Sequence, residues 1–244
     1  MNWRETLDGL EKGAIRAAYK KGQNWHADKT VKNAILEAFK EGELRNMQGF
    51  VDKDNLAPRS FDSSQGIRVV PGGTAVRRGA HVAKGVIIMP PSYVNIGAFV
   101  DEDTMVDSHV LVGSCAQIGK RVHLSAGAQI GGVLEPVGQT PVIIEDDAFI
   151  GAGAVIVEGI LIRKNAVIAP GVVLSKSIPV FDCVAQRILE KEEGICENAV
   201  VVPGSRPAKS TWAKEFHLQM NCALIVKYRD SQSDASLLLE SVLR

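Results

Sequence analysis

The chain has 244 residues, enough for one large domain or two small ones. Its 28 Lys and Arg balance its 28 Asp and Glu, which argues against nucleic acid or an anionic membrane surface as a partner. A small-molecule substrate fits this composition better.

The first residues do not predict a secretory signal, because no basic stretch precedes an apolar run. No apolar stretch approaches the roughly eighteen residues of a membrane span. The cysteines are widely spaced without a Cys-x-x-Cys pair, which disfavours a zinc site or a disulfide framework. We therefore expect a cytoplasmic protein with free thiols at Cys115, Cys183, Cys196 and Cys222.

Residues 1–66 predict a helical region followed by a linker. Apolar periodicity favours a first helix over 3–21. A second helix is expected to begin at Asp28, an N-cap residue type, and to end before Gly42. Residues 43–66 are polar and rich in turn formers, as linkers are.

The central part of the chain, over 67–183, repeats with a period of six. An aliphatic residue recurs at every sixth position in two unbroken runs, and a small or aliphatic residue usually follows four positions later. The first run is Val76, Val82, Ile88, Val94, Val100, Val106, Val112, Ile118, Leu124 and Ile130, and the second is Ile144, Ile150, Ile156, Ile162, Ile168, Leu174 and Val180. A helix would repeat every 3.6 residues and a strand every 2. Each unit is therefore a short strand plus a corner, and stacked units predict a parallel β-helix of about six triangular coils.

Glycine often follows the inward aliphatic residue, as at Gly113, Gly119 and Gly151. We attribute these glycines to the corners, because a residue without a Cβ turns the chain without steric cost.

The repeat is interrupted once, between Ile130 and Ile144, by a polar segment that contains glycines and prolines. Such an insertion must loop out of one face of a solenoid, and insertions of this kind commonly lie at the binding face. We therefore regard it as a site candidate.

Residues 184–244 predict a C-terminal cap, since the end coil of a solenoid exposes unpaired strand edges. Apolar runs favour strands at 200–202 and 222–226, and a short closing helix is expected over 236–243.

Several motifs on the coils are more specific than the repeat. They are MPPSYVNIGAFVDE at 89–102, TMVD at 104–107, VGSCAQIGK at 112–120, VHLS at 122–125 and IGGVLEP at 130–136. With them the chain resembles the tetrahydrodipicolinate N-succinyltransferase family of lysine and diaminopimelate biosynthesis, from about residue 67 to 180.

The resemblance implies a homotrimer of left-handed parallel β-helices with active sites between subunits. It implies transfer of a succinyl group from succinyl-CoA to the amine of the ring-opened substrate, a dicarboxylic amino acid, without a metal. By motif, Asp107 matches the catalytic acidic residue and Arg68 a substrate-binding arginine.

The chemistry agrees with both assignments. An amine attacks a thioester only when deprotonated, so a nearby carboxylate such as Asp107 can accept its proton. Arginine binds a carboxylate bidentately, which suits Arg68 as a clamp for a dicarboxylate. Backbone N–H groups of the coils can hold the thioester oxyanion.

Further candidates lie on the coils and beyond them. His109 occupies a position that is usually aromatic in the family, so we expect it to contact substrate, as we do Glu135 in the insertion. His123 is expected to be structural. The residues expected to contact acyl-CoA are Gly151 and Ala169 on the coils, and Lys176 and Lys209 for its phosphates.

Two departures from the family pattern keep alternatives open. Gly151-Ala-Gly-Ala-Val155 stands where the family often has Gly-Ala-Arg-Ser-Glu, and a helical segment between Leu44 and Gly66 is missing. Acetyl-CoA as the donor, or another amino diacid of secondary metabolism as the acceptor, therefore stays an alternative. A non-enzymatic β-helix is a third, although His81, His109 and His123 lack the spacing of a zinc triad in such folds.

Overall fold

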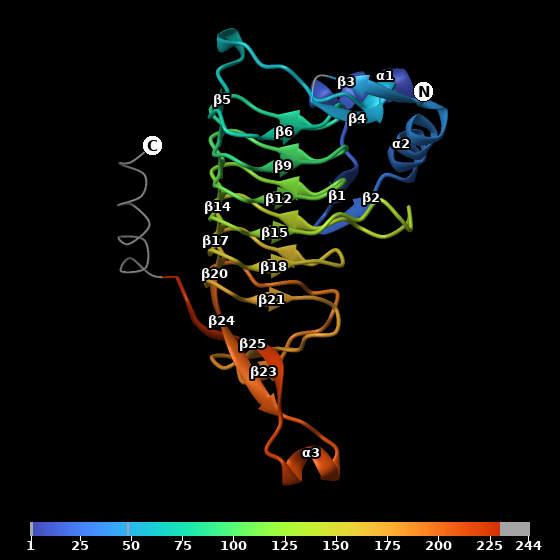
Figure 1. The fold of residues 1–244 in the computed structure, drawn as a ribbon. Helices are drawn as coiled ribbons and strands as arrows, with labels where there is room; N and C mark the ends of the chain where they lie inside the picture. The colour runs from blue at the N-terminus through green and yellow to red at the C-terminus, as the bar shows by residue number, and fades with distance from the viewer. Residues whose placement is uncertain (1, 48, 230–244) are drawn as a thin grey trace.

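Two-residue strands stacked in three sheets form the centre of the molecule (Figure 1). The computed structural model describes residues 2–47 and 49–229. Sheet A contains β5 (Arg68–Val69), β8 (Ile87–Ile88), β11 (Met105–Val106), β14 (His123–Leu124), β17 (Phe149–Ile150) and β20 (Val167–Ile168). Sheet B contains β6 (Ala75–Val76), β9 (Tyr93–Val94), β12 (Leu111–Val112), β15 (Gln129–Ile130), β18 (Val155–Ile156) and β21 (Val173–Leu174). Sheet C contains β7 (His81–Val82), β10 (Phe99–Val100), β13 (Gln117–Ile118), β16 (Ile143–Ile144) and β19 (Leu161–Ile162).

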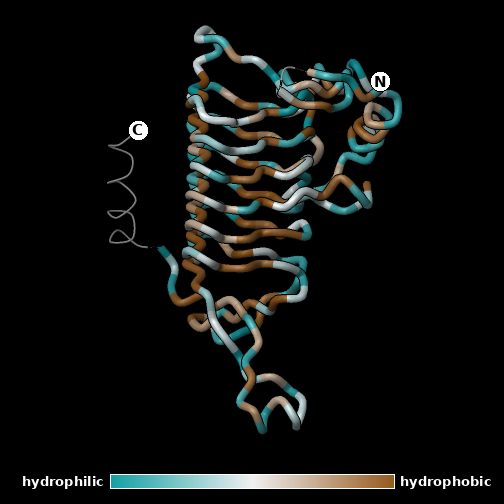
Figure 2. Tube along the Cα trace, in the orientation of Figure 1, coloured by the Kyte–Doolittle hydropathy of each residue, from teal (hydrophilic) through white to brown (hydrophobic). Residues whose placement is uncertain are grey.

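The chain visits sheets A, B and C in turn, so each triangular coil has three corners: A–B, B–C and C–A. All pairs between coils are parallel, for example Val106 with Leu124. From Val76 to Leu174, the aliphatic residue of each repeat is the second residue of a strand and is buried, and these side chains form one continuous core. The backbone trace in Figure 2 shows hydrophobic residues recurring in every coil. The predicted β-helix and its period are confirmed.

The interruption of the repeat is an outward loop at corner B–C, between β15 and β16. Ile118 still pairs with Ile144 across it, so the coil resumes in register. We call residues 131–142 the insertion loop.

The expected role of the glycines after the inward aliphatic residue is wrong. Gly113, Gly119 and Gly151 do not have a positive φ. A Cβ on them would lie 2.1 to 2.5 Å from an atom of the neighbouring coil: from the backbone at Gly113 and Gly151, and from the Asp146 carboxylate at Gly119. These glycines are therefore required by the close stacking of coils.

The N-terminal region differs from its prediction. Helix α1 (Trp3–Glu11) is followed by Gly13 at φ 71 and then by a hairpin of β1 (Ala18–Lys21) and β2 (Asn24–Ala27). The predicted helix over 3–21 is therefore wrong in its second half.

The second predicted helix is confirmed as α2 (Lys29–Glu41). Asp28 accepts hydrogen bonds from the N–H groups of Thr30 and Val31, which caps its first turn, and Gly42 is its C-cap. None of the helices in the described part of the chain has the length and apolarity needed to cross a membrane.

The expected linker contains regular structure. β3 (Leu44–Met47) and β4 (Phe50–Lys53) form a hairpin, followed by 3-10 turns η1 (Asp54–Leu56) and η2 (Ser63–Gln65). Leu56 joins a second core with α1 and α2, and this core includes Ile96 and Cys115 from corner B–C. The N-terminal unit, residues 2–47 and 49–66, is thus packed against that corner.

A buried carboxylate joins the N-terminal hairpin to sheet C. Glu145 Oε1 accepts hydrogen bonds from Lys20 Nζ at 2.7 Å and from Trp25 Nε1 at 2.9 Å. Burial alone would raise the pKa of Glu145, but these donors outweigh it and lower the pKa.

We expect Glu145→Gln to lower the free energy of unfolding by about 1–3 kcal/mol near neutral pH, because the Lys20 ammonium loses its charged partner. Since the folded-state pKa is lowered, this stabilisation is present above the unfolded-state pKa and is lost as pH falls through the folded-state pKa. Urea unfolding of both proteins across that range would measure it. A difference that stays constant into acid would contradict this origin.

The C-terminal cap contains both predicted strands, and they are longer than expected. β24 (Ala199–Pro207) continues sheet A and pairs with β25 (Gln219–Tyr228), with α3 (Thr211–Glu215) at the tip of the ribbon. β22 (Val180–Asp182) and β23 (Arg187–Ile188) form a small hairpin beside β25. The helix expected over 236–243 lies outside the described residues.

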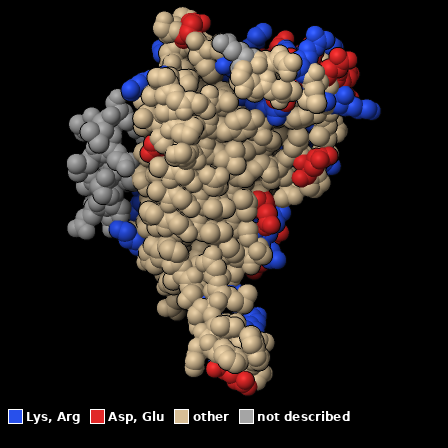
Figure 3. All heavy atoms as spheres, viewed as in Figure 1, with Lys and Arg blue, Asp and Glu red and all other residues tan. Residues whose placement is uncertain are grey.

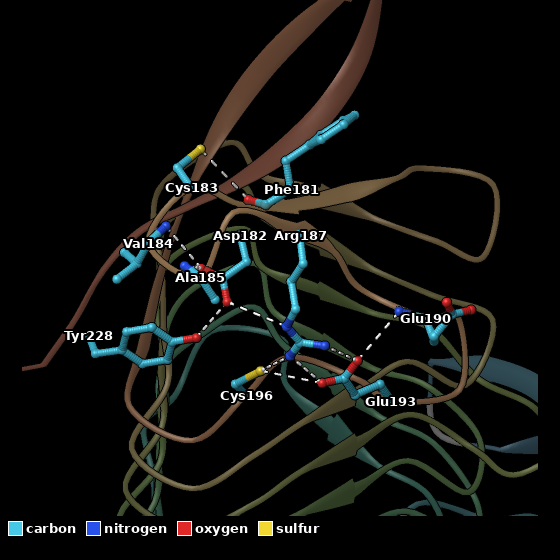
Figure 4. Close-up of polar contacts among 10 residues, drawn as sticks. All are labelled: Phe181, Asp182, Cys183, Val184, Ala185, Arg187, Glu190, Glu193, Cys196 and Tyr228. Carbon is cyan, nitrogen blue, oxygen red and sulfur yellow. Dashed lines mark hydrogen bonds and ion pairs between the residues drawn. The ribbon is translucent and has the colours of Figure 1, made fainter.

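A polar cluster holds this cap together (Figure 4). Asp182 is buried and accepts a hydrogen bond from the Tyr228 hydroxyl at 2.7 Å and from the N–H of Ala185 at 2.9 Å. Arg187 lies 4.0 Å from the same carboxylate and pairs with Glu193. Because every member has a partner, we assign this cluster to the stability of the cap.

Candidate functional site

Asp107 lies on corner A–B, immediately after the inward residue Val106 of β11. Its backbone N–H donates to the Leu124 carbonyl of the next coil at 2.9 Å. Its Oδ1 accepts a hydrogen bond from the Ser108 N–H at 2.7 Å. The coil therefore fixes the backbone, and the neighbouring turn orients the carboxylate.

The turn after Asp107 recurs in each of the following coils, toward the C-terminal end of the solenoid. Its tip is His109 in one coil and Gly127, Gly153 and Gly171 in the coils that follow, all with positive φ. A Cβ on Gly153 or Gly171 would meet no atom within 4 Å. We call these tips the corner column. Beyond His109 it has no side chain, so backbone forms the surface.

Two residues predicted to contact acyl-CoA lie beside this column. Gly151 and Ala169 occupy the position of Asp107 in later coils, as the bond from Gly151 N–H to the Ile168 carbonyl shows. The structure thus brings both onto the corner of Asp107. Gly151 is buried beneath the corner, however, and Ala169 is only partly exposed.

Arg68 lies at the outward position of β5, at the N-terminal end of sheet A, and is exposed. It pairs with Ile87, which pairs with Met105, so two strand spacings of about 4.8 Å separate it from β11. Arg68 and Asp107 are therefore near one another on sheet A and its A–B edge.

His109 is exposed beside a shallow hollow of about 410 Å³. The backbone N–H of His109 donates a hydrogen bond to the Pro91 carbonyl at 2.7 Å. The backbone carbonyl of His109 accepts one from Gln129 Nε2 at 3.3 Å. Tyr93 and Gln129 line the same hollow from sheet B. Sequence reasoning missed these two. Their signal was the outward strand position, one residue before the inward aliphatic one.

The other candidates do not meet Asp107 within one chain. Glu135 is exposed on the insertion loop at corner B–C. Lys176 follows β21 at that corner, where it borders an apolar cavity of about 400 Å³ at the end of the solenoid. Lys209 is exposed near α3, at the far tip of the cap (Figure 1).

Two other histidines, His81 and His123, stack on aromatic rings of the next coil. The ring centroids of His81 and Phe99 are 4.4 Å apart, and those of His123 and Phe149 are 5.0 Å apart. Burial lowers the pKa of His81. Within residues 2–47 and 49–229, no three or more His, Cys, Asp or Glu side chains are grouped to hold a metal ion.

Charge is unevenly distributed over the surface. The broad face in Figure 3, over sheet B, is almost free of charged side chains, which gather at its margins. Its outward residues are Ala75, Tyr93, Leu111, Gln129, Val155 and Val173. A face of this kind suits contact with another protein surface.

Comparison with known proteins identifies the family to which this chain is related. Residues 3–40 match the family model "Tetrahydrodipicolinate N-succinyltransferase N-terminal", and residues 141–176 match "Hexapeptide repeat of succinyl-transferase". Two similar relatives are 2,3,4,5-tetrahydropyridine-2,6-dicarboxylate N-succinyltransferases. That of Cereibacter sphaeroides is 41% identical over 98% of this chain and 87% of its own length, and that of Acinetobacter baylyi is 43% identical over 98% and 88%.

A solved structure agrees at the level of the fold. A 2,3,4,5-tetrahydropyridine-2-carboxylate N-succinyltransferase of Campylobacter jejuni superimposes with a TM-score of 0.58 at 16% identity. The match covers 92% of this chain and 63% of that one. By its identity to the curated relatives across nearly its whole length, this chain belongs to the tetrahydrodipicolinate N-succinyltransferase family.

Proposed function

We propose that this protein transfers the succinyl group of succinyl-CoA to the amine of ring-opened tetrahydrodipicolinate, 2-amino-6-oxopimelate, in lysine and diaminopimelate biosynthesis. The observation that carries the proposal is the position of Asp107. Its carboxylate is held at the start of the bare corner column, in a chain 41% to 43% identical to such enzymes.

In the proposed reaction the substrate amine attacks the thioester carbonyl. Asp107 accepts the amine proton as the N–C bond forms, the C–S bond then breaks, and the CoA sulfur leaves as a thiolate that takes up a proton. Arg68 binds a substrate carboxylate as a bidentate clamp.

The corner column is the proposed path for the acyl-CoA arm. A slender chain can lie against Gly127, Gly153 and Gly171, because no side chain stands between it and the backbone. Ala169 borders this path, Gly151 lies beneath it, and Lys176 and Lys209 are the proposed phosphate contacts.

A homotrimer completes the proposal, with the uncharged face over sheet B as part of the contact between subunits. One chain places Asp107 at corner A–B but Glu135 and Lys176 at corner B–C. A cleft between two subunits can combine the two corners, so that Asp107 of one subunit faces the insertion loop of its neighbour. We further propose that the enzyme works in the cytoplasm.

One observation supports acetyl-CoA as an alternative donor. Where relatives of this family often have Arg-Ser-Glu, this chain has Gly153, Ala154 and Val155, so corner A–B offers no cation at that point to the free carboxylate of a succinyl group. Acetyl-CoA has no such carboxylate, so its binding would not need a cation at this point.

A steady-state assay with both donors and tetrahydrodipicolinate decides between them. We expect kcat/KM for succinyl-CoA to exceed that for acetyl-CoA by at least about tenfold, the preference given by one charged hydrogen bond to the succinyl carboxylate from a part of the cleft other than this point of corner A–B. CoA is also expected to raise the melting temperature by mass action. Turnover with acetyl-CoA alone would reassign the donor, and absence of both turnover and stabilisation would favour a non-enzymatic β-helix.

A further inference from the structure

One lysine of the N-terminal unit is fully buried. Lys32, on α2, has 0% of its surface exposed. Its ammonium donates hydrogen bonds to the carbonyl oxygens of Val133 and Gln139, both at 2.6 Å. These partners are more than 100 positions away in the chain and both belong to the insertion loop.

Burying the Lys32 ammonium costs free energy of desolvation. Taking an ammonium out of water is strongly unfavourable unless its protons are well bound, and carbonyl oxygens neutralise it less than a carboxylate would. Lys32 takes part in none of the ion pairs among the residues that the structure describes, and the titratable neighbour that acts on its amine is the Cys115 thiol rather than a carboxylate. Burial accordingly lowers the pKa of its amine. An apolar residue of similar length would fill the space but would leave the carbonyl oxygens of Val133 and Gln139 without this donor, so the ammonium contributes more than packing.

Its two bonds close the insertion loop. Val133 lies on the arm that leaves corner B–C and Gln139 on the arm that returns, with Glu135 between them. A single ammonium that binds both arms fixes the distance between them. It therefore ties both arms of the loop to α2.

Other contacts tie the same loop to the N-terminal unit. Leu134 packs against the second core beside α1 and α2. The Thr140 hydroxyl donates to the Trp25 carbonyl of β2 at 3.4 Å. Leu134 points into the protein, whereas its neighbour Glu135 is exposed. The loop is therefore anchored through Leu134, while the side chain of Glu135 faces solvent.

We propose that Lys32 is a positioning residue that holds the insertion loop in the conformation that presents Glu135 to the acyl-transfer cleft. The N-terminal unit thereby acts on the reaction through the loop. This inference rests on the proposed function for its kinetic consequence, but not for its structural one.

Hydrogen exchange measured by mass spectrometry tests the structural part without any turnover. Lys32→Met keeps the length of the side chain and removes the ammonium. We expect faster exchange in peptides that cover 131–142, with unchanged exchange in coils such as 161–174. Lys53→Met is the matched control, because Lys53 Nζ also donates to a backbone carbonyl, that of Gly42 at 2.7 Å, within the N-terminal unit but away from the loop.

Kinetics test the positioning role. We expect Lys32→Met to lower kcat/KM by about 10-fold to 100-fold, as a small misplacement of a binding group does, and Lys53→Met to leave it unchanged. In a Glu135→Gln background the effect of Lys32→Met should nearly vanish, because both changes remove the same contribution. Lys32→Gln, which retains a neutral donor nitrogen on a shorter side chain, should fall between wild type and Lys32→Met, and it serves as the folded variant if Lys32→Met does not fold.

Unchanged exchange in the loop would overturn the proposal. Additive effects of Lys32→Met and Glu135→Gln would also overturn it, since Lys32 would then act on the fold in general. Inactivity of the wild-type enzyme with both donors would refute the proposed function instead, and the exchange result would still decide whether Lys32 holds the loop.

Discussion

Asp107→Asn is expected to lower kcat/KM by about 100-fold to 10,000-fold, the range that general base catalysis contributes. An amide cannot accept the proton of the attacking amine. The substitution is otherwise mild, because the asparagine Oδ1 can still accept the hydrogen bond from the Ser108 N–H. Steady-state kinetics on the purified variant, with its oligomeric state checked against wild type, would measure the loss.

Two further measurements would show whether a loss of activity in Asp107→Asn is due to proton transfer. Activity of Asp107→Asn should recover partly at high pH, where the substrate amine loses its proton without help. Glu102→Gln is the matched control, since Glu102 is an exposed carboxylate at corner C–A that pairs with Lys120. The proposed mechanism would be wrong if Asp107→Asn kept wild-type kcat/KM, or if Glu102→Gln lost as much.

The β-helix could be predicted from the sequence because its fold repeats locally. Every inward residue such as Val106 or Leu124 meets the same environment one coil further on, so the pattern needs no knowledge of distant contacts. The hairpin at 18–27 was missed for the opposite reason. Its strands are stabilised by contacts such as that of Lys20 with Glu145, 125 positions away, and tertiary contacts of this kind override local periodicity.

The candidate site was predictable only in part, for a related reason. Asp107, Gly151 and Ala169 lie on one corner because they hold equivalent positions in stacked coils, which the repeat already encodes. Glu135 and Lys176 lie at another corner, and a spacing along one chain says nothing about how the two corners would meet in the proposed trimer. Lys32 had no signal at all, because in sequence it resembles any lysine of an amphipathic helix.

Corner A–B contains two kinds of glycine, and substitutions at them are expected to have different effects on stability and on donor binding. Gly151 has an ordinary backbone conformation, but a Cβ there would lie 2.5 Å from the backbone nitrogen of Pro170 in the next coil. Gly153 has φ 67, and a Cβ there would meet open space. Close stacking therefore requires the first glycine, and the turn requires the second.

We expect Gly151→Ala to lower the free energy of unfolding by about 3 kcal/mol, at the upper end of overpacking costs, because the methyl group meets backbone that cannot move aside. At this chain length that corresponds to a fall in melting temperature of about 6–12 °C. Gly153→Asn should cost less than about 1 kcal/mol, since asparagine tolerates a positive φ. It should instead raise KM for the acyl-CoA donor, because its side chain projects into the corner column. Thermal unfolding and donor kinetics on the two variants would separate these roles, and a stable Gly151→Ala protein with a raised donor KM would show that Gly151 contacts acyl-CoA rather than the next coil.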